Sequence, residues 1–530
     1  MSLAAACTSG TFAPTLFGAE ILSVQASLVT NYNQFVDGTY RRTQPSIDVK
    51  DASFCNITVT YTHPGQNDNI IVEAWLPVDN WNQRFQAVGG GGWNTGRTTG
   101  VYYAMAGAIG DGYATITTDA GLGTYSDPSP WILLSPGNVN MYYLQNFATS
   151  SLGDEAILGK ALIKDFYGEG PLYSYWNGCS TGGRQGLTLA QRYPDAYDGI
   201  AAGAPVIYWT RVGMSNIWPQ QYMNMENFYP YGCELEAITA AAVTACDGLD
   251  GVVDGLISDP DTCVASFDPT SLVGSTIDNC TQTGGPITIS EGAAKLASAL
   301  WDGSRTVAGD KIWFGLSIGS DLTMMASTNC STGTCVGNPG KYGWDLFRYF
   351  VAKDPKWESD NISHETYEAM GHSAFQQWQS AMDFDDPDIS GFHNAGGKLI
   401  TYHGMADNLI PAQGTDHYYQ LVSDLFPDVD DFYRHFPIPG LGHCSGGRGG
   451  QPSGMFAQLR AWVENGTAPE HSSMKFTALD GTNQTRILCP FPKKPFYNGH
   501  CGNSSDSTCW TCVKRGEGST SPTSKNLWHL

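Results

Sequence analysis

Short runs of apolar and β-branched residues come first in the chain and are bounded by Gly-rich or Asp-Gly turns. The runs at 55–62, 70–76, 84–88 and 113–117 predict strands of one growing sheet. Residues 142–166 then have the alanine and leucine spacing of a helix, and the apolar run 172–176 predicts a short buried strand. This alternation of strand and helix predicts an α/β architecture.

The pattern changes after residue 205. Aromatic residues, a Cys/Asp/Gly-rich stretch at 246–263 and one predicted helix near 290–301 fill the region up to about residue 398, where strand alternation resumes with KLITYHG and DFYRHFPIPG. A predicted helix at 455–464 follows. We expect a discontinuous core formed by residues 1–205 and 394–490, an inserted domain at 206–393, and a cysteine-containing tail at 491–530 whose end is disordered.

Composition restricts the possible partners of the protein. The chain has 530 residues, with 28 Lys and Arg against 51 Asp and Glu, and its net charge of −23 argues against binding to nucleic acid or to an anionic membrane. No run approaches the roughly 18 apolar residues of a membrane span. Because MSLAAACTSG does not have the form of a signal sequence, we expect a soluble mature chain whose signal has been removed or replaced.

Fourteen cysteines without paired zinc-type modules indicate disulfides and an oxidising, extracellular environment. The Cys509-Trp-Thr-Cys512 segment favours a local or tail-tying disulfide over zinc. Seven Asn-x-Ser/Thr sequons support secretion and are candidate glycosylation sites: Asn56, Asn279, Asn329, Asn361, Asn465, Asn483 and Asn503.

The segment GCSTG at 178–182 fits G-x-S-x-G, the sharp turn that projects a serine nucleophile from the end of a strand. A second match contains Ser317, so the motif alone does not decide. Ser180 follows the strand-like LYSYW and precedes GRQGLTLAQRYP, which has one apolar helical face, whereas no comparable helix follows Ser317. We therefore predict Ser180 as the nucleophile.

A serine nucleophile needs a histidine base and an acid that orients the histidine, and in this class of fold the chain order is Ser, then Asp or Glu, then His. Asp407 lies in the loop that leaves the KLITYHG strand, and His443 lies in the PGLGH loop after the next strand. We predict these two as the acid and the base. The alternatives are that Asp407 caps a helix and His443 is a solvated loop residue, with His403, His435 or His417 as the competing bases.

Two cysteines adjoin the predicted pair, because Cys179 precedes Ser180 and Cys444 follows His443. If Ser180 and His443 come within hydrogen-bonding distance, their neighbours come within reach of a disulfide. We predict a Cys179–Cys444 disulfide that holds the base beside the nucleophile. The alternative is that Cys179 is a small residue filling the turn and that Cys444 pairs elsewhere.

The segments GCSTGGRQG, HGMADNLIP and GLGHCSGG resemble the serine, aspartate and histidine-cysteine motifs of the tannase and feruloyl esterase family, including its disulfide between adjacent cysteines. The resemblance extends from about residue 7 to residue 490 and is strongest to fungal secreted feruloyl esterases. It implies an α/β-hydrolase core with an inserted lid, and a secreted serine esterase that hydrolyses feruloyl esters of plant cell-wall polysaccharides. The alternatives are a tannase acting on galloyl esters, another aromatic-ester hydrolase, or a catalytically inactive binding protein on the same scaffold.

An esterase also needs N–H donors for the oxyanion of the tetrahedral intermediate. The N–H of Thr181 is one expected donor, and the second is expected from the glycine run 89–92, with Gly90 and Gly91 preferred. A nucleotide-phosphate loop competes for this run, but no Lys-Ser or Lys-Thr follows it. Aromatic residues that could line the acyl pocket are Tyr208, Trp209, Trp218, Trp313, Phe314 and Trp344.

Three aspartates, Asp247, Asp250 and Asp254, occur within CDGLDGVVDGLI, where carboxylates without a cation would repel one another. Calcium favours such loops, although Asp-Gly pairs are equally typical of plain turns, and the spacing does not fit an EF-hand. The family resemblance implies a structural calcium site here, with the carbonyls of Val252 and Leu256 completing the ligands. Further cysteines expected in disulfides are Cys246 and Cys263, which would brace this loop, together with Cys7 and Cys55.

Overall fold

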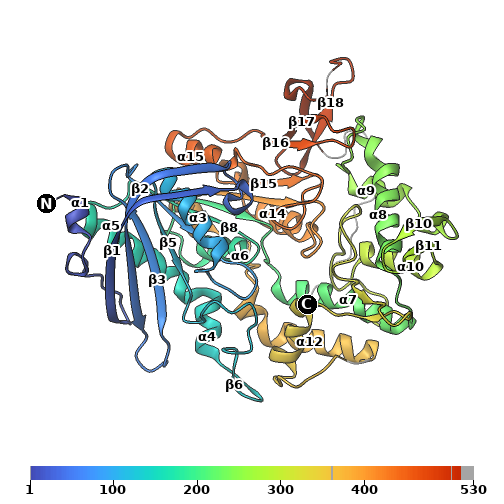
Figure 1. Cartoon of the computed structure of the whole chain (residues 1–530), viewed down its shortest axis with the longest axis horizontal. Helices are drawn as coiled ribbons and strands as arrows, with labels where there is room; N and C mark the ends of the chain where they lie inside the picture. Colours follow the sequence, from blue (N-terminus) through green and yellow to red (C-terminus); the bar gives the residue numbers. More distant parts are fainter. Residues whose placement is uncertain (1, 360–361, 503, 515–530) are drawn as a thin grey trace.

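A nine-stranded mixed sheet forms the centre of the molecule (Figure 1). The computed structural model describes residues 2–359, 362–502 and 504–514, so the end of the chain expected to be disordered lies outside the described residues. The spatial order is β1-β2-β3-β5-β4-β8-β9-β14-β15, antiparallel from β1 to β5 and parallel from β5 onward. The strands are β1 (Glu20–Val36), β2 (Ile47–Thr62), β3 (Ile70–Pro77), β4 (Arg84–Val88), β5 (Ala114–Thr118), β8 (Tyr173–Cys179), β9 (Gly199–Gly203), β14 (Lys398–Gly404) and β15 (Tyr433–Ile438).

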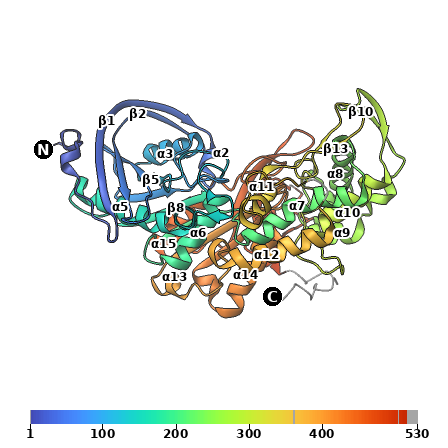
Figure 2. The same ribbon diagram turned by 90° about the horizontal axis from the view of Figure 1, so that it is seen from below.

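The antiparallel part of the sheet begins with two long strands that the sequence predicts incompletely. β1 is not predicted, and β2 begins at Ile47 although the predicted run begins at residue 55. β1 is an edge strand in which only Val36 is buried, so it lacks the strong apolar alternation of a half-buried strand. In Figure 2, β1 and β2 curve over α3 (Thr99–Gly110), another element that the sequence does not predict.

Helices cover both faces of the parallel part of the sheet. α5 (Ser151–Tyr167), α6 (Thr181–Arg192) and α14 (Gln413–Leu425) pack on one face, and α3 and α15 (Met455–Asn465) pack on the other. Trp176 of β8 points into the first layer and Tyr175 into the second, as the alternation of a strand requires. This is the α/β architecture that the sequence predicts.

The chain between β9 and β14, residues 204–397, is mainly helical and is called the lid here (Figure 1). Its longer helices are α7 (Trp209–Glu226), α8 (Gly232–Cys246), α10 (Glu291–Asp302) and α12 (His364–Met382). In its described part, none of its strands joins the nine-stranded sheet. The lid does contain two short antiparallel pairs where the sequence shows no alternation: β10 (Thr276–Cys280) with β11 (Gly285–Thr288), and β12 (Thr328–Asn329) with β13 (Val336–Gly337).

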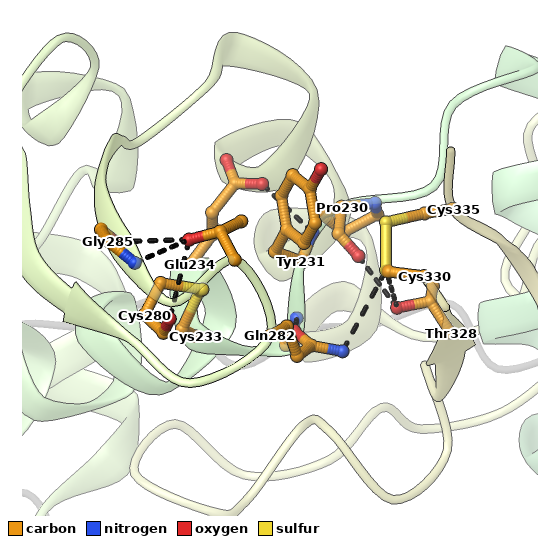
Figure 3. Close-up of a disulfide and its surroundings, with 12 residues drawn as sticks. Pro230, Tyr231, Cys233, Glu234, Cys280, Gln282, Gly285, Thr328, Cys330 and Cys335 are labelled. Carbon is orange, nitrogen blue, oxygen red and sulfur yellow. Dashed lines mark hydrogen bonds between the residues drawn. A yellow bond between two sulfur atoms is a disulfide. The ribbon is translucent and has the colours of Figure 1, made fainter. Parts of the chain in front are cut away.

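Disulfides fix α8 within the lid at both of its ends. Cys233 near its start is bonded to Cys280, and Cys246 at its end is bonded to Cys263. Figure 3 shows the first of these beside the Cys330–Cys335 disulfide, with Gln282 lying between the two. The Gln282 amide accepts a hydrogen bond from the N–H at the start of α8 and contacts Cys330 Sγ at 3.8 Å.

The C-terminal segment forms two hairpins, β16 (Ser472–Thr477) with β17 (Asn483–Leu488) and β18 (Lys493–Tyr497) with β19 (Trp510–Lys514). Cys509 and Cys512 pair with Cys501 and Cys489 respectively, so the prediction of disulfides at these cysteines is confirmed: the first bond is local to the tail and the second ties the tail to the residue after β17. The segment also contacts the lid, because Lys494 Nζ lies 2.9 Å from Asp259 Oδ2. Shorter elements are α1 (Leu3–Ala6), α2 (Gly38–Arg41), β6 (Leu133–Ser135), β7 (Asn138–Val139), α4 (Met141–Gln145), α9 (Pro260–Ser266), α11 (Lys341–Asp345) and α13 (Ser390–Asn394).

Over the described ranges, no helix combines the length and the apolar character needed to cross a membrane.

Candidate active site

Ser180 lies at the sharp turn between β8 and α6. Its backbone has φ 64° and ψ −122°, a combination that residues with a side chain rarely adopt. Glycines allow the turn, because a Cβ on Gly178 would lie 2.5 Å from the carbonyl oxygen of Gly182. The N–H of Ser180 donates to the carbonyl of Gly203 at the end of β9 (2.9 Å). The turn is therefore held against the neighbouring strand, with the serine raised from the sheet edge.

Asp407 lies in the loop after β14, and its side chain is buried, with 1% of the residue exposed. Its Oδ1 accepts hydrogen bonds from the N–H groups of Leu409 and Ile410, at 2.8 and 2.9 Å. Its Oδ2 lies 2.8 Å from His443 Nδ1 and 3.1 Å from His403 Nε2. Both oxygens are engaged as acceptors, which suits an ionised carboxylate.

Two histidines set the ionisation of Asp407. Burial alone would raise the pKa of Asp407, but the neighbouring His443 and the hydrogen bond from His403 lower it well below its ordinary value. The Nε2 of His403 faces two acceptors, Asp407 Oδ2 and the carbonyl of Ile410, while its Nδ1 lies 2.7 Å from the hydroxyl of Thr415. This pattern assigns the proton of His403 to Nε2. From the sequence, His403 is a competing base or a packed residue. No local pattern in the sequence predicts its contact with Asp407.

A line of hydrogen bonds joins Asp407 to His443 and His443 to Ser180. The Nε2 of His443 lies 2.9 Å from Ser180 Oγ, while its Nδ1 contacts the carboxylate of Asp407. Cys179 and Cys444 form the predicted disulfide, with their Cα atoms 6.0 Å apart. The structure therefore brings together all three residues of the predicted triad. The disulfide joins the segments that carry Ser180 and His443.

The glycine loop after β4 lies beside the serine, but two of its N–H groups are committed elsewhere. Gly90 N donates to Gln185 Oε1 at 2.9 Å, and Gly91 N donates to the carbonyl of Asn94 at 3.0 Å. These bonds do not fit the preference for Gly90 and Gly91 as oxyanion donors. The N–H of Gly92, the last glycine of the run, has no hydrogen-bond partner among the described residues, and Gly92 has φ 59° at the tip of the loop.

Thr181 is the first residue of α6, and the first N–H groups of a helix have no partner within the helix. Its hydroxyl donates to the carbonyl of Gly92 at 2.6 Å. This contact fixes the glycine loop to the start of α6, next to Ser180.

A cavity of about 320 Å³, called the nucleophile pocket here, is lined by Ser180 and His443. Thr181 and Gly92, whose N–H groups could bind an oxyanion, also line it. Its walls come from the core and from the lid and are largely apolar: Trp93, Val206, Trp209, Val212, Tyr342, Leu346, Leu409 and Ile410. Of the aromatic residues considered from the sequence, only Trp209 lines it. Trp93 and Tyr342 are additions that depend on tertiary packing, and Tyr208, Trp218, Trp313, Phe314 and Trp344 pack within hydrophobic clusters instead.

The competing residues other than His403 lie away from this line of hydrogen bonds. Ser317 is buried in the lid. His435, whose pKa is lowered by burial, lies between Thr401 Oγ1 at 2.9 Å and Asp416 Oδ1 at 3.0 Å. His417 packs against the rings of Tyr208 and Phe314, both in the lid. In the described part of the chain, none of the three contacts Ser180.

Two of the three aspartates of the Cys/Asp/Gly-rich stretch contact Arg486 of β17. Arg486 donates to Asp250 Oδ2 at 2.8 Å and forms an ion pair with Asp254, while Asp247 accepts from the N–H of Asp254 at 2.9 Å. Burial raises the pKa of Asp254 to about 7, although Arg486 opposes this. Within the described residues, no group of three or more His, Cys, Asp or Glu is arranged to hold a metal ion. The residues expected to supply carbonyl ligands, Val252 and Leu256, are buried in the same loop.

All fourteen cysteines are paired, in seven disulfides, and the predicted participation of Cys7, Cys55, Cys246 and Cys263 is confirmed. The bonded pairs are Cys7–Cys55 and Cys246–Cys263. Among the sequons, Asn279, Asn329, Asn465 and Asn483 are exposed, and Asn56 lies partly buried in β2. The sequons at Asn361 and Asn503 lie outside the described residues.

A sheet whose parallel part carries a serine at a strand-to-helix turn, hydrogen-bonded in line with a histidine and a buried aspartate, defines an α/β hydrolase. The family profile described as tannase and feruloyl esterase matches residues 55–513, and the chain belongs to this family. The protein is accordingly a carboxylic ester hydrolase.

Three comparisons illustrate the extent of the similarity. The chain is 37% identical to a probable feruloyl esterase of Arthroderma benhamiae, over 94% of this chain and 92% of that protein. It is 28% identical to the solved tannin acyl hydrolase from Aspergillus niger, with a TM-score of 0.86 over 97% of this chain and 96% of that one. It is also 28% identical to the crystal structure of feruloyl esterase B from Aspergillus oryzae, with a TM-score of 0.78 over 97% of this chain and all of that one.

Proposed function

We propose that the protein is a secreted serine esterase that hydrolyses feruloyl and related hydroxycinnamoyl esters of plant cell-wall polysaccharides. The observation that carries the proposal is the line of hydrogen bonds from Asp407 through His443 to Ser180 at the wall of the nucleophile pocket. Its aromatic and aliphatic walls suit a flat phenolic acyl group. Seven disulfides and four exposed sequons support secretion, with Asn279, Asn329, Asn465 and Asn483 as the proposed glycosylation sites.

In the proposed reaction, Ser180 Oγ attacks the ester carbonyl while His443 Nε2 takes the serine proton. The imidazolium is stabilised by Asp407, whose low pKa keeps it ionised. His443 then gives the proton to the leaving alcohol, which produces an acyl-enzyme on Ser180. A water molecule activated by His443 attacks this ester, and the aromatic acid leaves.

The oxyanion of each tetrahedral intermediate is proposed to accept hydrogen bonds from the N–H groups of Thr181 and Gly92. Gly92 replaces Gly90 and Gly91 in this role because the N–H groups of the latter two already have partners within 3.0 Å. The hydrogen bond from the Thr181 hydroxyl to the Gly92 carbonyl holds the two donor residues together before substrate binds.

A galloyl ester is the second candidate substrate. The high structural similarity to a tannin acyl hydrolase favours it, and the apolar pocket walls suit a gallate ring as well as a ferulate ring. Because ferulate is longer by a vinyl group, the two acyl groups place their ring hydroxyls at different depths of the pocket.

The Cys/Asp/Gly-rich loop is proposed to bind a structural calcium ion. The support is electrostatic, because Asp250 and Asp254 share the single guanidinium of Arg486, the carboxylate of Asp247 accepts from backbone N–H groups, and an excess of buried negative charge remains. Asp247, Asp250 and Asp254 would hold the ion through carboxylates, and Val252 and Leu256 through carbonyls. When bound, calcium would supply charge compensation to the loop, which the Cys246–Cys263 disulfide braces.

Hydrolysis of methyl ferulate, methyl caffeate and methyl gallate by the purified protein tests the proposal. We expect a higher kcat/KM for the two hydroxycinnamates than for the gallate. Ser180→Ala should abolish the activity and the labelling by a serine-reactive phosphonate while retaining the circular dichroism spectrum of the folded protein. An unchanged rate in Ser180→Ala would refute the assigned nucleophile, and a preference for methyl gallate would favour the tannase alternative.

A further inference from the structure

The nucleophile pocket carries a fixed positive charge that the proposed mechanism does not use. Among the described residues that line the pocket, Arg42 is the one lysine or arginine, and none is Asp or Glu. The chain as a whole has a net charge of −23, so the pocket is opposite in sign to the protein around it. A cation inside a partly enclosed pocket attracts anions. The pocket is therefore suited to a substrate that carries a negative charge.

The guanidinium of Arg42 is available to a ligand. Arg42 is half-buried, and within the part of the chain that the structure describes its side chain has neither a hydrogen bond nor an ion pair, while its nitrogen atoms stay accessible. Its neighbour Arg41 differs, because it is buried, forms an ion pair with Asp111 and donates to the carbonyl of Pro45. Taking a guanidinium out of water without a partner costs free energy, and an anionic ligand would offset that cost. Arg41 thus has a structural role, whereas Arg42 has its donors left for substrate.

The backbone at Arg42 is strained and is fixed to the strand that carries the nucleophile. Arg42 has φ 61° and ψ −79°, a combination that residues with a side chain rarely adopt. Both of its neighbours are bound to Asn177 of β8, three residues before Ser180. Asn177 Nδ2 donates to the carbonyl of Arg41 at 3.1 Å, and the hydroxyl of Thr43 donates to Asn177 Oδ1 at 3.1 Å. Strain that is held in this way is typical of positions that clamp a ligand.

We infer that Arg42 binds a carboxylate that the substrate carries in addition to the ester cleaved at Ser180. The planar fork of a guanidinium matches the two oxygens of a carboxylate and binds them with two parallel hydrogen bonds. A neutral hydroxyl or methoxy group would leave the charge of Arg42 uncompensated. Because Ser180 and His443 line the same pocket as Arg42, the carboxylate can belong to the acyl part or to the alcohol part. The inference rests on the proposed function, since it requires Ser180 to cleave an aromatic ester.

Two pairs of esters that differ only in a carboxylate and its neutral carboxamide test the inference. Methyl para-carboxycinnamate and methyl para-carbamoylcinnamate place the group on the acyl part, and carboxymethyl ferulate and carbamoylmethyl ferulate place it on the alcohol part. For each pair, kcat/KM of the acid is divided by kcat/KM of the amide. Arg42→Gln should lower this ratio at least about tenfold for one pair, which identifies the part of the substrate that Arg42 contacts. Arg42→Lys keeps the charge but not the fork and should lower the ratio less.

Lys50→Gln is the matched control, because it removes the same charge from a side chain that is 72% exposed and does not line the pocket. It should leave both ratios within about twofold of the wild type. Each ratio is internal to one preparation, so a smaller folded fraction in a variant does not change it. If Arg42→Gln leaves both ratios at the wild-type level, or lowers them no further than Lys50→Gln does, the inference is wrong.

Methyl ferulate, which has no free carboxylate, tests the proposed function separately. Its hydrolysis, together with unchanged ratios in Arg42→Gln, would leave the proposed function standing and refute the inference. If the wild type hydrolyses the para-substituted cinnamates in an Arg42-dependent manner but does not hydrolyse methyl ferulate, the proposed function fails and the carboxylate assignment holds. If it hydrolyses none of these esters, both fail.

Discussion

Cys179 and Cys444 are 265 residues apart in the chain and are joined by a disulfide. Cys179 directly precedes Ser180, and Cys444 directly follows His443, whose Nε2 lies 2.9 Å from Ser180 Oγ. The disulfide connects the end of β8 to the loop after β15, and so holds together the two segments between which the proton of Ser180 passes to His443. The geometry of the site therefore depends on a link that neither segment could provide alone.

Replacing both Cys179 and Cys444 with alanine is expected to lower kcat on methyl ferulate at least about tenfold, because small displacements of a base from its nucleophile are costly. KM should change less than kcat. The matched control is the double alanine variant of Cys330 and Cys335, a lid disulfide between residues only five apart in sequence. Near-normal kcat in the first variant would show that packing alone holds the histidine loop.

Removing His403, the second histidine that contacts Asp407, should change the pH profile of the activity. His403→Leu deletes a donor to Asp407, so the pKa of Asp407 rises toward its ordinary value or above it. The acid limb of kcat/KM should therefore move to higher pH, and kcat at neutral pH should fall about tenfold. His403→Gln retains an amide donor and should restore part of the activity. A loss of thermal stability without any shift of the pH profile would contradict this role.

Glu464 is expected to stabilise the fold in a pH-dependent manner. The guanidinium of Arg84 binds its carboxylate at 2.7 and 2.6 Å, and Tyr175 also donates to it at 2.7 Å. These hydrogen bonds lower the pKa of Glu464 to about 2 from 4.5. Because the folded state binds the proton less tightly than the unfolded state does, the stabilisation is complete above about pH 5 and is lost as the pH falls toward 2.

Glu464→Gln should accordingly lower the free energy of unfolding by about 1 to 2 kcal/mol at pH 7, after allowance for solvent screening. The difference from the wild type should shrink between about pH 5 and pH 3 in urea titrations. Glu470→Gln is the control, because Glu470 lies on the surface with 71% of its side chain exposed and should show no such trend. A pH-independent difference would mean that the amide disturbs packing instead.

Removal of calcium should destabilise the lid without changing the chemistry of the site. Dialysis against a chelator is expected to lower Tm by several degrees, and added calcium should restore it. Asp247→Asn should abolish the response to calcium, whereas Asp321→Asn, outside the loop, should retain it. The rate on methyl ferulate at 25 °C should stay within about twofold of the wild type. A Tm that does not respond to the chelator would exclude the proposed ion.

The sequence is informative where short-range chemistry determines the structure. The strands of the parallel part other than β9 (Gly199–Gly203), the turn at Ser180 and the order of Ser180, Asp407 and His443 follow from local patterns and a fold rule. β1 is not predicted because an edge strand with a largely exposed face has little apolar periodicity. The contact of His403 with Asp407, and the hydrogen bonds that engage the Gly90 and Gly91 amides, involve partners selected by tertiary packing, which no spacing in the chain encodes.

The position of the lid within the chain also constrains how the protein matures. Six cysteines, all of the lid, are synthesised after Cys179 and before Cys444, and they pair among themselves across 47, 17 and 5 residues. Short loops close faster and at lower entropic cost than long ones. During biosynthesis the Cys179 thiol must therefore remain reduced, or be released from a wrong partner, until the ribosome has delivered Cys444. The disulfide at the active site can therefore form only after the whole lid has been synthesised.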